Sequence, residues 1–215
     1  MTNAMFFQKD YILRMIELMG ALMRHISEML DDMGRNRELS DACLLHCGMD
    51  LQAAEKLSLE SLTELLAPIP RLMLSEILYI KAMQTSLPKE EQQMLLYRSA
   101  KLLMTLREES LLCEMRKDQL DFCLKEAREL FTPQDLLEAA EFFFEGEAFG
   151  RGEDMLFDAL ALAGGTAGYT SLLIQAKALL SRCLSVPAQR LTAGGLPRPE
   201  VLEGLTALER RLAAL

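Results

Sequence analysis

The chain has 215 residues, half of them apolar, which is enough for a sizeable hydrophobic core and excludes a chain that is disordered throughout. Its formal net charge of −9 argues against nucleic acid as the main partner, because phosphate binding requires a basic surface. Helix-forming residues dominate, whereas Val occurs only at Val186 and Val201. Since no segment alternates apolar and polar residues over the length of a strand, the composition predicts an all-α fold.

We expect a cytoplasmic protein that has no membrane partner. No run of residues approaches the ~18 consecutive apolar positions that a membrane-spanning helix requires. Residues 1–10 lack the basic start and apolar stretch of a signal peptide. The five cysteines, an odd number, are typical of a reducing compartment.

The first predicted element is a long amphipathic helix over residues 9–33 that ends at Gly34. Methionine is flexible and polarisable, which suits an adaptable binding surface. We therefore regard a methionine stripe as the best candidate for binding a partner, including a second copy of the chain in a homodimer. Ordinary packing against the following helices is the alternative. The stripe consists of Met15, Met19, Met23, Met29 and Met33.

Shorter helices are predicted next. Residues 36–47 form one that ends at Gly48, and Asp50 and Ser58 are typical N-cap residues for two more. Pro68 and Pro70 then predict an extended stretch, because a residue that precedes proline avoids the helical conformation.

These signals divide the chain into four parts. An N-terminal helical segment covers residues 1–68, and helical repeats cover 69–185. A linker rich in Pro and Gly follows at 186–198, and a C-terminal helix covers 199–215. The predicted helices of the repeat region are 71–85, 88–107, 109–130, 133–145, 150–163 and 169–184, and Thr132 is the N-cap of the fourth.

One helical hairpin carries small residues at the positions where two helices must approach closely. The residues are Ala139 and Phe142 in the first helix, Gly146-Glu147 in the turn, and Gly152, Leu156 and Ala159-Leu160 in the second helix. In these positions the segment 132–162 resembles a tetratricopeptide-type repeat. It departs from the pattern by one surplus residue between the turn and Ala159, and by Gly164-Gly165 where the repeat normally ends in proline.

The resemblance implies antiparallel helical hairpins stacked as an irregular tetratricopeptide-like solenoid, preceded by the long N-terminal helix. An irregular helical bundle is the alternative. Because stacked hairpins present an extended binding surface, the resemblance also implies a protein that binds a peptide or protein partner and has no enzymatic activity. Carboxylate-clamp repeats are a poor match, since they use Asn residues and this chain has only Asn3 and Asn36.

The N-terminus carries a second resemblance. Phe6-Phe7-Gln8-Lys9-Asp10-Tyr11-Ile12-Leu13-Arg14-Met15-Ile16-Glu17, together with His46-Cys47-Gly48-Met49, is similar to the start of an uncharacterised family of cytosolic helical proteins from anaerobic Gram-positive bacteria. This similarity covers about the first 80 residues and implies no function.

Cys43, His46 and Cys47 are the densest group of metal-ligating side chains. Their spacing places all three on one side of a helix, where they could ligate a soft metal if the fold supplied a fourth ligand. Buried packing of the two thiols, with His46 near the helix C-terminus, is the favoured interpretation. We therefore expect no metal and no cofactor.

Aromatic and acidic residues gather around the hairpin. Phe142, Phe143, Phe144, Phe149 and Phe157 suggest an alternative function, a small-molecule-sensing domain with a pocket under this aromatic cluster. The acidic residues Glu138, Glu141, Glu145, Glu147, Glu153 and Asp154 are interpreted as a solvated face.

Overall fold

A computed structural model describes residues 14, 20 and 32–215. This part of the chain contains helices and no strand, so the all-α prediction is confirmed. The chain forms two compact units, residues 1–103 and residues 104–215, and each is described by itself. Within the described residues, no helix has both the length and the apolar character needed to cross a bilayer.

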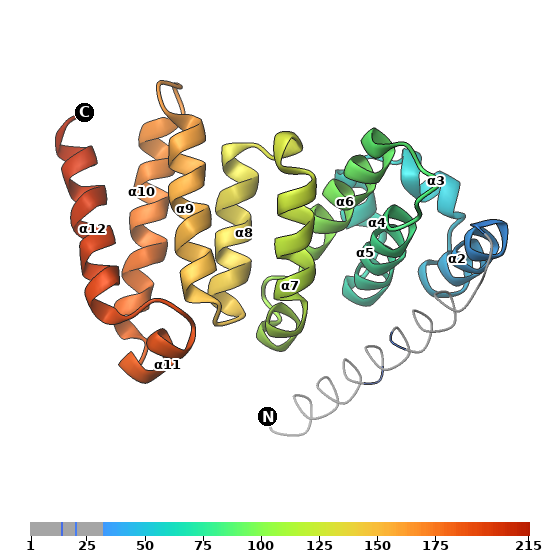
Figure 1. Cartoon of the computed structure of the whole chain (residues 1–215), viewed down its shortest axis with the longest axis horizontal. Coiled ribbons are helices and arrows are strands. Elements are labelled where there is room, and N and C mark those ends of the chain that lie inside the picture. The colour runs from blue at the N-terminus through green and yellow to red at the C-terminus, as the bar shows by residue number, and fades with distance from the viewer. Residues whose placement is uncertain (1–13, 15–19, 21–31) are drawn as a thin grey trace. The chain divides into compact units, whose positions relative to one another are not determined.

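The first unit is built from five described helices. They are α2 (Asp32–Cys47), α3 (Leu51–Lys56), α4 (Leu59–Leu65), α5 (Pro68–Ala82) and α6 (Lys89–Met104), whose last residue lies at the boundary (Figure 1). Helix α5 is the centre of this unit, because it packs against α2 and nine of its residues are buried.

Local capping chemistry sets the short helices where the sequence predicts them. The Asp50 side chain accepts a hydrogen bond from the Ala53 amide at 3.1 Å and caps α3. Ser58 caps α4 in the same way. Gly48, at φ +69°, follows the end of α2 in the left-handed conformation that glycine adopts without strain. The predicted stop at Gly34 is wrong, since α2 runs from Asp32 through this residue.

The predicted extended stretch around Pro68 and Pro70 is also wrong. Helix α5 begins at Pro68, three residues earlier than expected. The first amide groups of a helix have no intrahelical partner, so a proline there loses no hydrogen bond. The first amide that needs an acceptor belongs to Arg71, which donates to the Ala67 carbonyl at 3.1 Å.

The second unit contains helices that pack in chain order. They are α7 (Ser110–Glu126), the 3-10 turn η1 (Arg128–Leu130), α8 (Pro133–Glu145), α9 (Phe149–Ala163), α10 (Tyr169–Arg182), the 3-10 turn η2 (Cys183–Ser185), α11 (Ala188–Ala193) and α12 (Arg198–Ala213). Helix α8 packs on α7 and most extensively on α9. Helix α10 packs on α9, on α8 and on α12, and Figure 1 shows these long helices side by side.

The start of α8 follows the predicted capping chemistry. Thr132 accepts from the Asp135 amide at 3.2 Å, and the Asp135 carboxylate accepts from the Thr132 amide at 2.8 Å, which completes a capping box. The preceding helix was predicted to run to residue 130, but α7 ends at Glu126. The turn η1 follows and places the Phe131 side chain in the core immediately before the cap.

Candidate functional site

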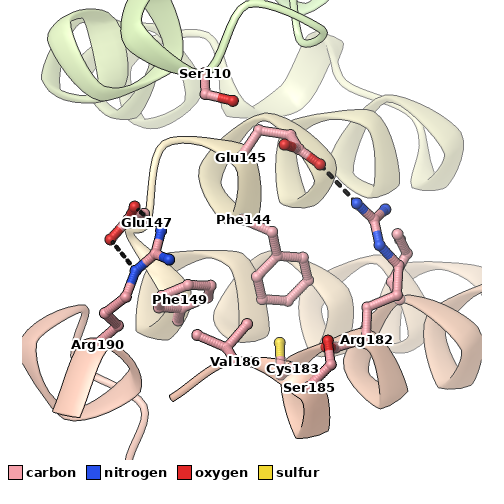
Figure 2. A pocket seen from close by; sticks show the side chains of 11 residues that line it. Ser110, Phe144, Glu145, Glu147, Phe149, Arg182, Cys183, Ser185, Val186 and Arg190 are labelled. Carbon is pink, nitrogen blue, oxygen red and sulfur yellow. Dashed lines mark hydrogen bonds and ion pairs between the residues drawn. The ribbon is translucent and has the colours of Figure 1, made fainter. Parts of the chain in front are cut away.

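A pocket of about 270 Å³ in the second unit is the best candidate for a functional site. It lies between the C-terminal ends of α8 and α10, the turn that joins α8 to α9, and α11, with Ser110 at the start of α7. Figure 2 shows that the side chains from these elements surround one space.

The wall formed by the α8–α9 turn is fixed to the residues that follow α11. The Gly150 amide donates a hydrogen bond to the Gly194 carbonyl at 2.9 Å. A Cβ on Gly150 would lie only 2.7 Å from the Gly195 carbonyl oxygen, and one on Gly194 would collide with the Glu147 carbonyl oxygen. Only residues without a Cβ allow two backbones to approach this closely. The contact holds α11 beside the turn, so the pocket is preformed.

The same turn is packed against α7 on another side. A Cβ on Gly146 would lie 2.7 Å from the carbonyl carbon of Cys113 and 2.9 Å from the amide nitrogen of Glu114. The turn therefore has backbone neighbours from α7 and from the residues after α11. Three elements of the unit meet there.

Apolar side chains form the middle of the pocket lining, with charged side chains on either side of them. The Phe144 and Phe149 rings lie 6.3 Å apart between centroids with a tilt of 32°, and Phe144 rests on Gly152 of α9. Leu179 and Val186 add aliphatic surface. A ligand in the pocket therefore contacts aromatic and aliphatic side chains as well as charged ones.

Two arginine–glutamate pairs stand on opposite sides of this interior (Figure 2). Arg182 Nη2 lies 2.6 Å from Glu145 Oε1. Arg190 binds Glu147 through two nitrogens, with Nε 3.2 Å from Oε2 and Nη2 on Oε1. These two hydrogen bonds lower the pKa of Glu147. The four charges cancel, so the rim as a whole is neutral but strongly dipolar.

Glu147 is also the one non-glycine residue with a positive φ, 57°, within the described part of the chain. This conformation carries a steric cost for a residue with a Cβ, and such residues concentrate at functional sites. The paired guanidinium of Arg190 and the close backbone contacts of the turn hold Glu147 in place.

The pocket also contains a thiol. Cys183 is almost fully buried, and burial raises the pKa of its thiol to about 11, with Glu153 adding to the shift and Arg182 opposing it. The thiolate is the reactive form, so Cys183 is a weak nucleophile at neutral pH. It contributes apolar surface to the pocket.

Helices α9 and α12 carry a second group of charges outside this pocket. Burial, together with the neighbouring carboxylates Asp154, Glu200 and Glu203, raises the pKa of Glu153 to about 7. Its carboxylate lies beside the backbone of Gly204, where a Cβ would approach Oε1 to 2.9 Å. This contact makes the packing of α12 sensitive to pH.

The aromatic cluster predicted from the sequence is divided by the structure. Phe144 and Phe149 line the pocket, whereas Phe142 and Phe143 are fully buried in the core and pack edge to face. Phe157 lies under the guanidinium of Arg211, 5.6 Å from the ring centroid.

The acidic residues of the hairpin were interpreted as a solvated face, but several are paired. Glu141 binds Arg107 at 2.7 Å, and Glu145 and Glu147 bind the two arginines of the pocket. Sequence reasoning missed these arginines. Arg182 and Arg190 lie 37 and 43 residues from their partners, so only the fold brings each pair together.

The group Cys43, His46 and Cys47 lies on α2. The two thiols are buried, and Cys47 Sγ donates to the Pro70 carbonyl at 3.4 Å. The hydrogen bond with Cys43, and then burial, raise the pKa of Cys47. His46 is half-buried. Within the described residues, no three His, Cys, Asp or Glu side chains are arranged to hold a metal ion.

Four members of the predicted methionine stripe lie outside the described residues, namely Met15, Met19, Met23 and Met29. Met33 is described, lies on α2 and is 86% exposed. The stripe stays a prediction.

A family model covers residues 6–213 of the chain. The chain therefore belongs to the class of proteins of unknown function described by that model, the family DUF6483. Neither the search of curated proteins nor the search of solved structures found a match.

Proposed function

We propose that this chain is a non-enzymatic helical-repeat protein of the bacterial cytoplasm that binds a peptide or protein partner. The observation that carries the proposal is the packing order of the second unit. Helix α8 pairs with α9, and α10 then packs on both helices of that hairpin before it pairs with α12. In tetratricopeptide-like stacking, the first helix of each hairpin contacts both helices of the preceding one, and this order supports that architecture.

The side chains at the helix contacts support the same interpretation. Ala139 of α8 and Ala159 of α9 are fully buried. The Phe144 ring packs directly against Gly152, in the space that a Cβ would occupy. These are the small positions on which the resemblance to a tetratricopeptide-type repeat rests. They allow the two helices to approach closely, which is what a stacked hairpin requires.

Helices α8 and α10 offer a surface for the partner. Glu138, Glu141 and Glu145 are half-buried and share one face of α8. The exposed residues Ile174, Ala178 and Arg182 share one face of α10. The Arg182–Glu145 pair joins the two faces where they reach the pocket. We call these six residues the α8/α10 face.

The chemistry of this face suggests its partner. Ile174 is 56% exposed and provides the apolar side chain of this face. On α8, Glu141 and Glu145 are about one third exposed and bind Arg107 and Arg182, so a basic residue of the partner would join or replace these pairs. A peptide segment that carries an apolar residue next to a basic one fits this surface.

Selection from a displayed peptide library tests the proposal, with the purified full chain as bait. We expect enrichment of apolar-basic peptides, and we expect Ile174→Asp to weaken their binding about tenfold or more by placing a charge in the contact. Leu202→Asp is the matched control, because Leu202 is 51% exposed on α12, away from the face. Absence of enriched peptides, or equal binding by both variants, would contradict the proposal.

Self-association through the methionine stripe is a separate part of the proposed partner binding. Light scattering of the full chain across a range of concentrations, with Met15, Met19 and Met23 replaced by Ala, tests it. A dimer that dissociates in the variant supports the stripe as an interface. A monomer in both proteins contradicts it.

The pocket favours a second candidate function, the sensing of a small molecule. An apolar interior with a few converging polar groups is the usual form of a small-ligand site, and Phe144 and Phe149 with the two ion pairs provide it. A screen of metabolites that measures the shift of the melting temperature tests this candidate. If none of the compounds raises the melting temperature, the result contradicts this candidate.

A further inference from the structure

We infer that the pocket binds a free α-amino acid with an apolar side chain, in its zwitterionic form. The inference rests on the second candidate function, and its site shares Glu145 and Arg182 with the α8/α10 face. It follows from the size of the pocket, from the order of polar and apolar groups in it, and from the unused hydrogen-bonding capacity of one of its two ion pairs.

Size limits the ligand to a small molecule. A dry cavity of about 150 Å³ accommodates benzene. By the same measure, the 270 Å³ of this pocket admits about ten non-hydrogen atoms, the size of leucine or phenylalanine. A nucleotide or a sugar chain is larger than this volume. Because the α8–α9 turn and the residues after α11 are locked by backbone contacts, the pocket does not have to form on binding.

The interior determines the side chain of the ligand. Phe144, Phe149 and Cys183 are buried, and each presents apolar surface to the pocket. Against these three residues, a polar ligand side chain would lose its water without gaining a strong hydrogen bond. An aliphatic or aromatic side chain of the ligand instead packs its methyl groups or its ring against the tilted rings of Phe144 and Phe149.

The two ion pairs differ in what they leave free. Arg190 meets Glu147 with two nitrogens, and both Glu147 oxygens are used, so this pair closes one side of the pocket. Arg182 meets Glu145 through one nitrogen and one oxygen only. A guanidinium has five N–H donors, and a carboxylate has two accepting oxygens. Within the described residues, the remaining donors of Arg182 and the second oxygen of Glu145 have no other assigned partner.

These free groups are a donor set and an acceptor side by side, which matches a zwitterion. The ligand carboxylate binds the remaining N–H groups of Arg182, and the ligand ammonium binds the second oxygen of Glu145. Ser110, the first residue of α7, adds a hydroxyl to the lining. A ligand without net charge also suits a rim whose four charges cancel.

A peptide terminus carries only one of these two charges. N-acetyl-leucine therefore represents a peptide C-terminus, and leucinamide represents a peptide N-terminus. A free amino acid uses both groups, so neither derivative should replace it.

Isothermal titration calorimetry on the full chain tests the inference. We expect leucine or phenylalanine to bind with a Kd of about 1 mM or tighter. N-acetyl-leucine, leucinamide and serine should each bind at least about tenfold more weakly, since each loses one of the three contacts. This comparison needs no variant and stands even if a substitution prevents folding.

Variants identify the site. Arg182→Gln and Glu145→Gln should each weaken leucine binding about 10- to 100-fold. Arg128→Gln is the matched control, because Arg128 forms a similarly exposed pair with Asp158, 2.9 Å apart and outside the pocket. Its affinity for leucine should equal that of the wild type.

Three results would overturn the inference: no saturable binding of leucine or phenylalanine, equal binding of either capped derivative, or equal affinity in Arg182→Gln and Arg128→Gln. If another class of metabolite raises the melting temperature while amino acids do not, the amino-acid assignment fails and ligand sensing stands. Peptide binding by the α8/α10 face is tested separately through Ile174→Asp, because Ile174 does not line the pocket.

Discussion

The two glycine-containing turns at the ends of α9 have similar composition but different environments. The turn before α9 is enclosed, with Gly146 against the backbone of α7 and Gly150 against Gly195. The turn after α9 is open, since a Cβ on Gly165 or Gly168 would meet nothing within 4 Å. One turn is a junction of three elements and forms a wall of the pocket, while the other only reverses the chain. Close packing, which the sequence does not display, separates a turn that supports a site from one that does not.

Among substitutions that compare the two turns, Gly194→Ala is expected to cause the largest loss of stability. The new Cβ would collide with the Glu147 carbonyl oxygen and the Phe149 ring, so the enclosed turn must move. We expect a loss of about 3 kcal/mol or more in the free energy of unfolding, measured by urea denaturation. Gly168→Ala is the control in the open turn and should change stability by less than about 0.5 kcal/mol. Similar losses in both variants would contradict the comparison.

Gly146→Ala should have the next largest effect. Its Cβ would lie 2.7 Å from the carbonyl carbon of Cys113, and α7 must shift to admit it. Because Gly146 has φ −84°, alanine is acceptable to its backbone and the cost is steric alone. We expect about 2 kcal/mol of destabilisation in the same urea experiment. An unchanged urea midpoint would show that the turn is not enclosed.

Local signals explain which parts of the fold were predictable. The caps at Asp50, Ser58 and Thr132 act within three residues, so the sequence contains the whole interaction. The start of α5 was misjudged because a proline in the first turn of a helix resembles a proline that excludes one.

The candidate site was predictable only in part. Phe144 and Phe149 belong to an aromatic cluster that is visible in the sequence, and both line the pocket. Arg182 and Arg190 carry no local signal, and their partners are 37 and 43 residues away. A pairing of this kind depends on how helices stack, which neither periodicity nor composition encodes.

The third prediction concerns pH and the packing of α12 rather than the turns. The pKa of Glu153 is raised to about 7 in the fold, above its ordinary value of 4.5. Between these values the folded chain binds more protons than the unfolded chain, so this group lowers stability as pH rises from about 5 to 8. The carboxylate is half exposed, and after allowance for solvent screening we expect a loss of about 1 kcal/mol.

Urea denaturation at pH 5 and pH 8 measures this effect. Glu153→Gln should remove it, and Glu129→Gln, at an exposed position in η1, should leave it unchanged. Asp154, whose pKa is also raised, acts in the same direction and remains in both variants. An equal pH dependence in the two variants would contradict the assignment to Glu153.

The smallest effect on stability is expected at the pocket itself. Arg182→Gln removes a pair whose side chains are 61% and 33% exposed. Exposed pairs contribute little, so we expect a change of about 0.5 kcal/mol in the free energy of unfolding. The enclosed glycines determine the shape of the pocket, and the arginine determines what it binds. If Arg182→Gln lowered the free energy of unfolding as much as Gly194→Ala, the arginine would also determine the shape of the pocket, which would contradict this division.

The central claim is that the α8–α9 turn is a fixed junction that holds the pocket in shape. Amide hydrogen exchange of the full chain, resolved by residue, tests it most directly. The Gly150 amide, bonded to Gly194, should exchange at least about a hundredfold more slowly than the amides of Gly165 and Gly168 in the open turn. Exchange of all three amides at similar rates would contradict the claim.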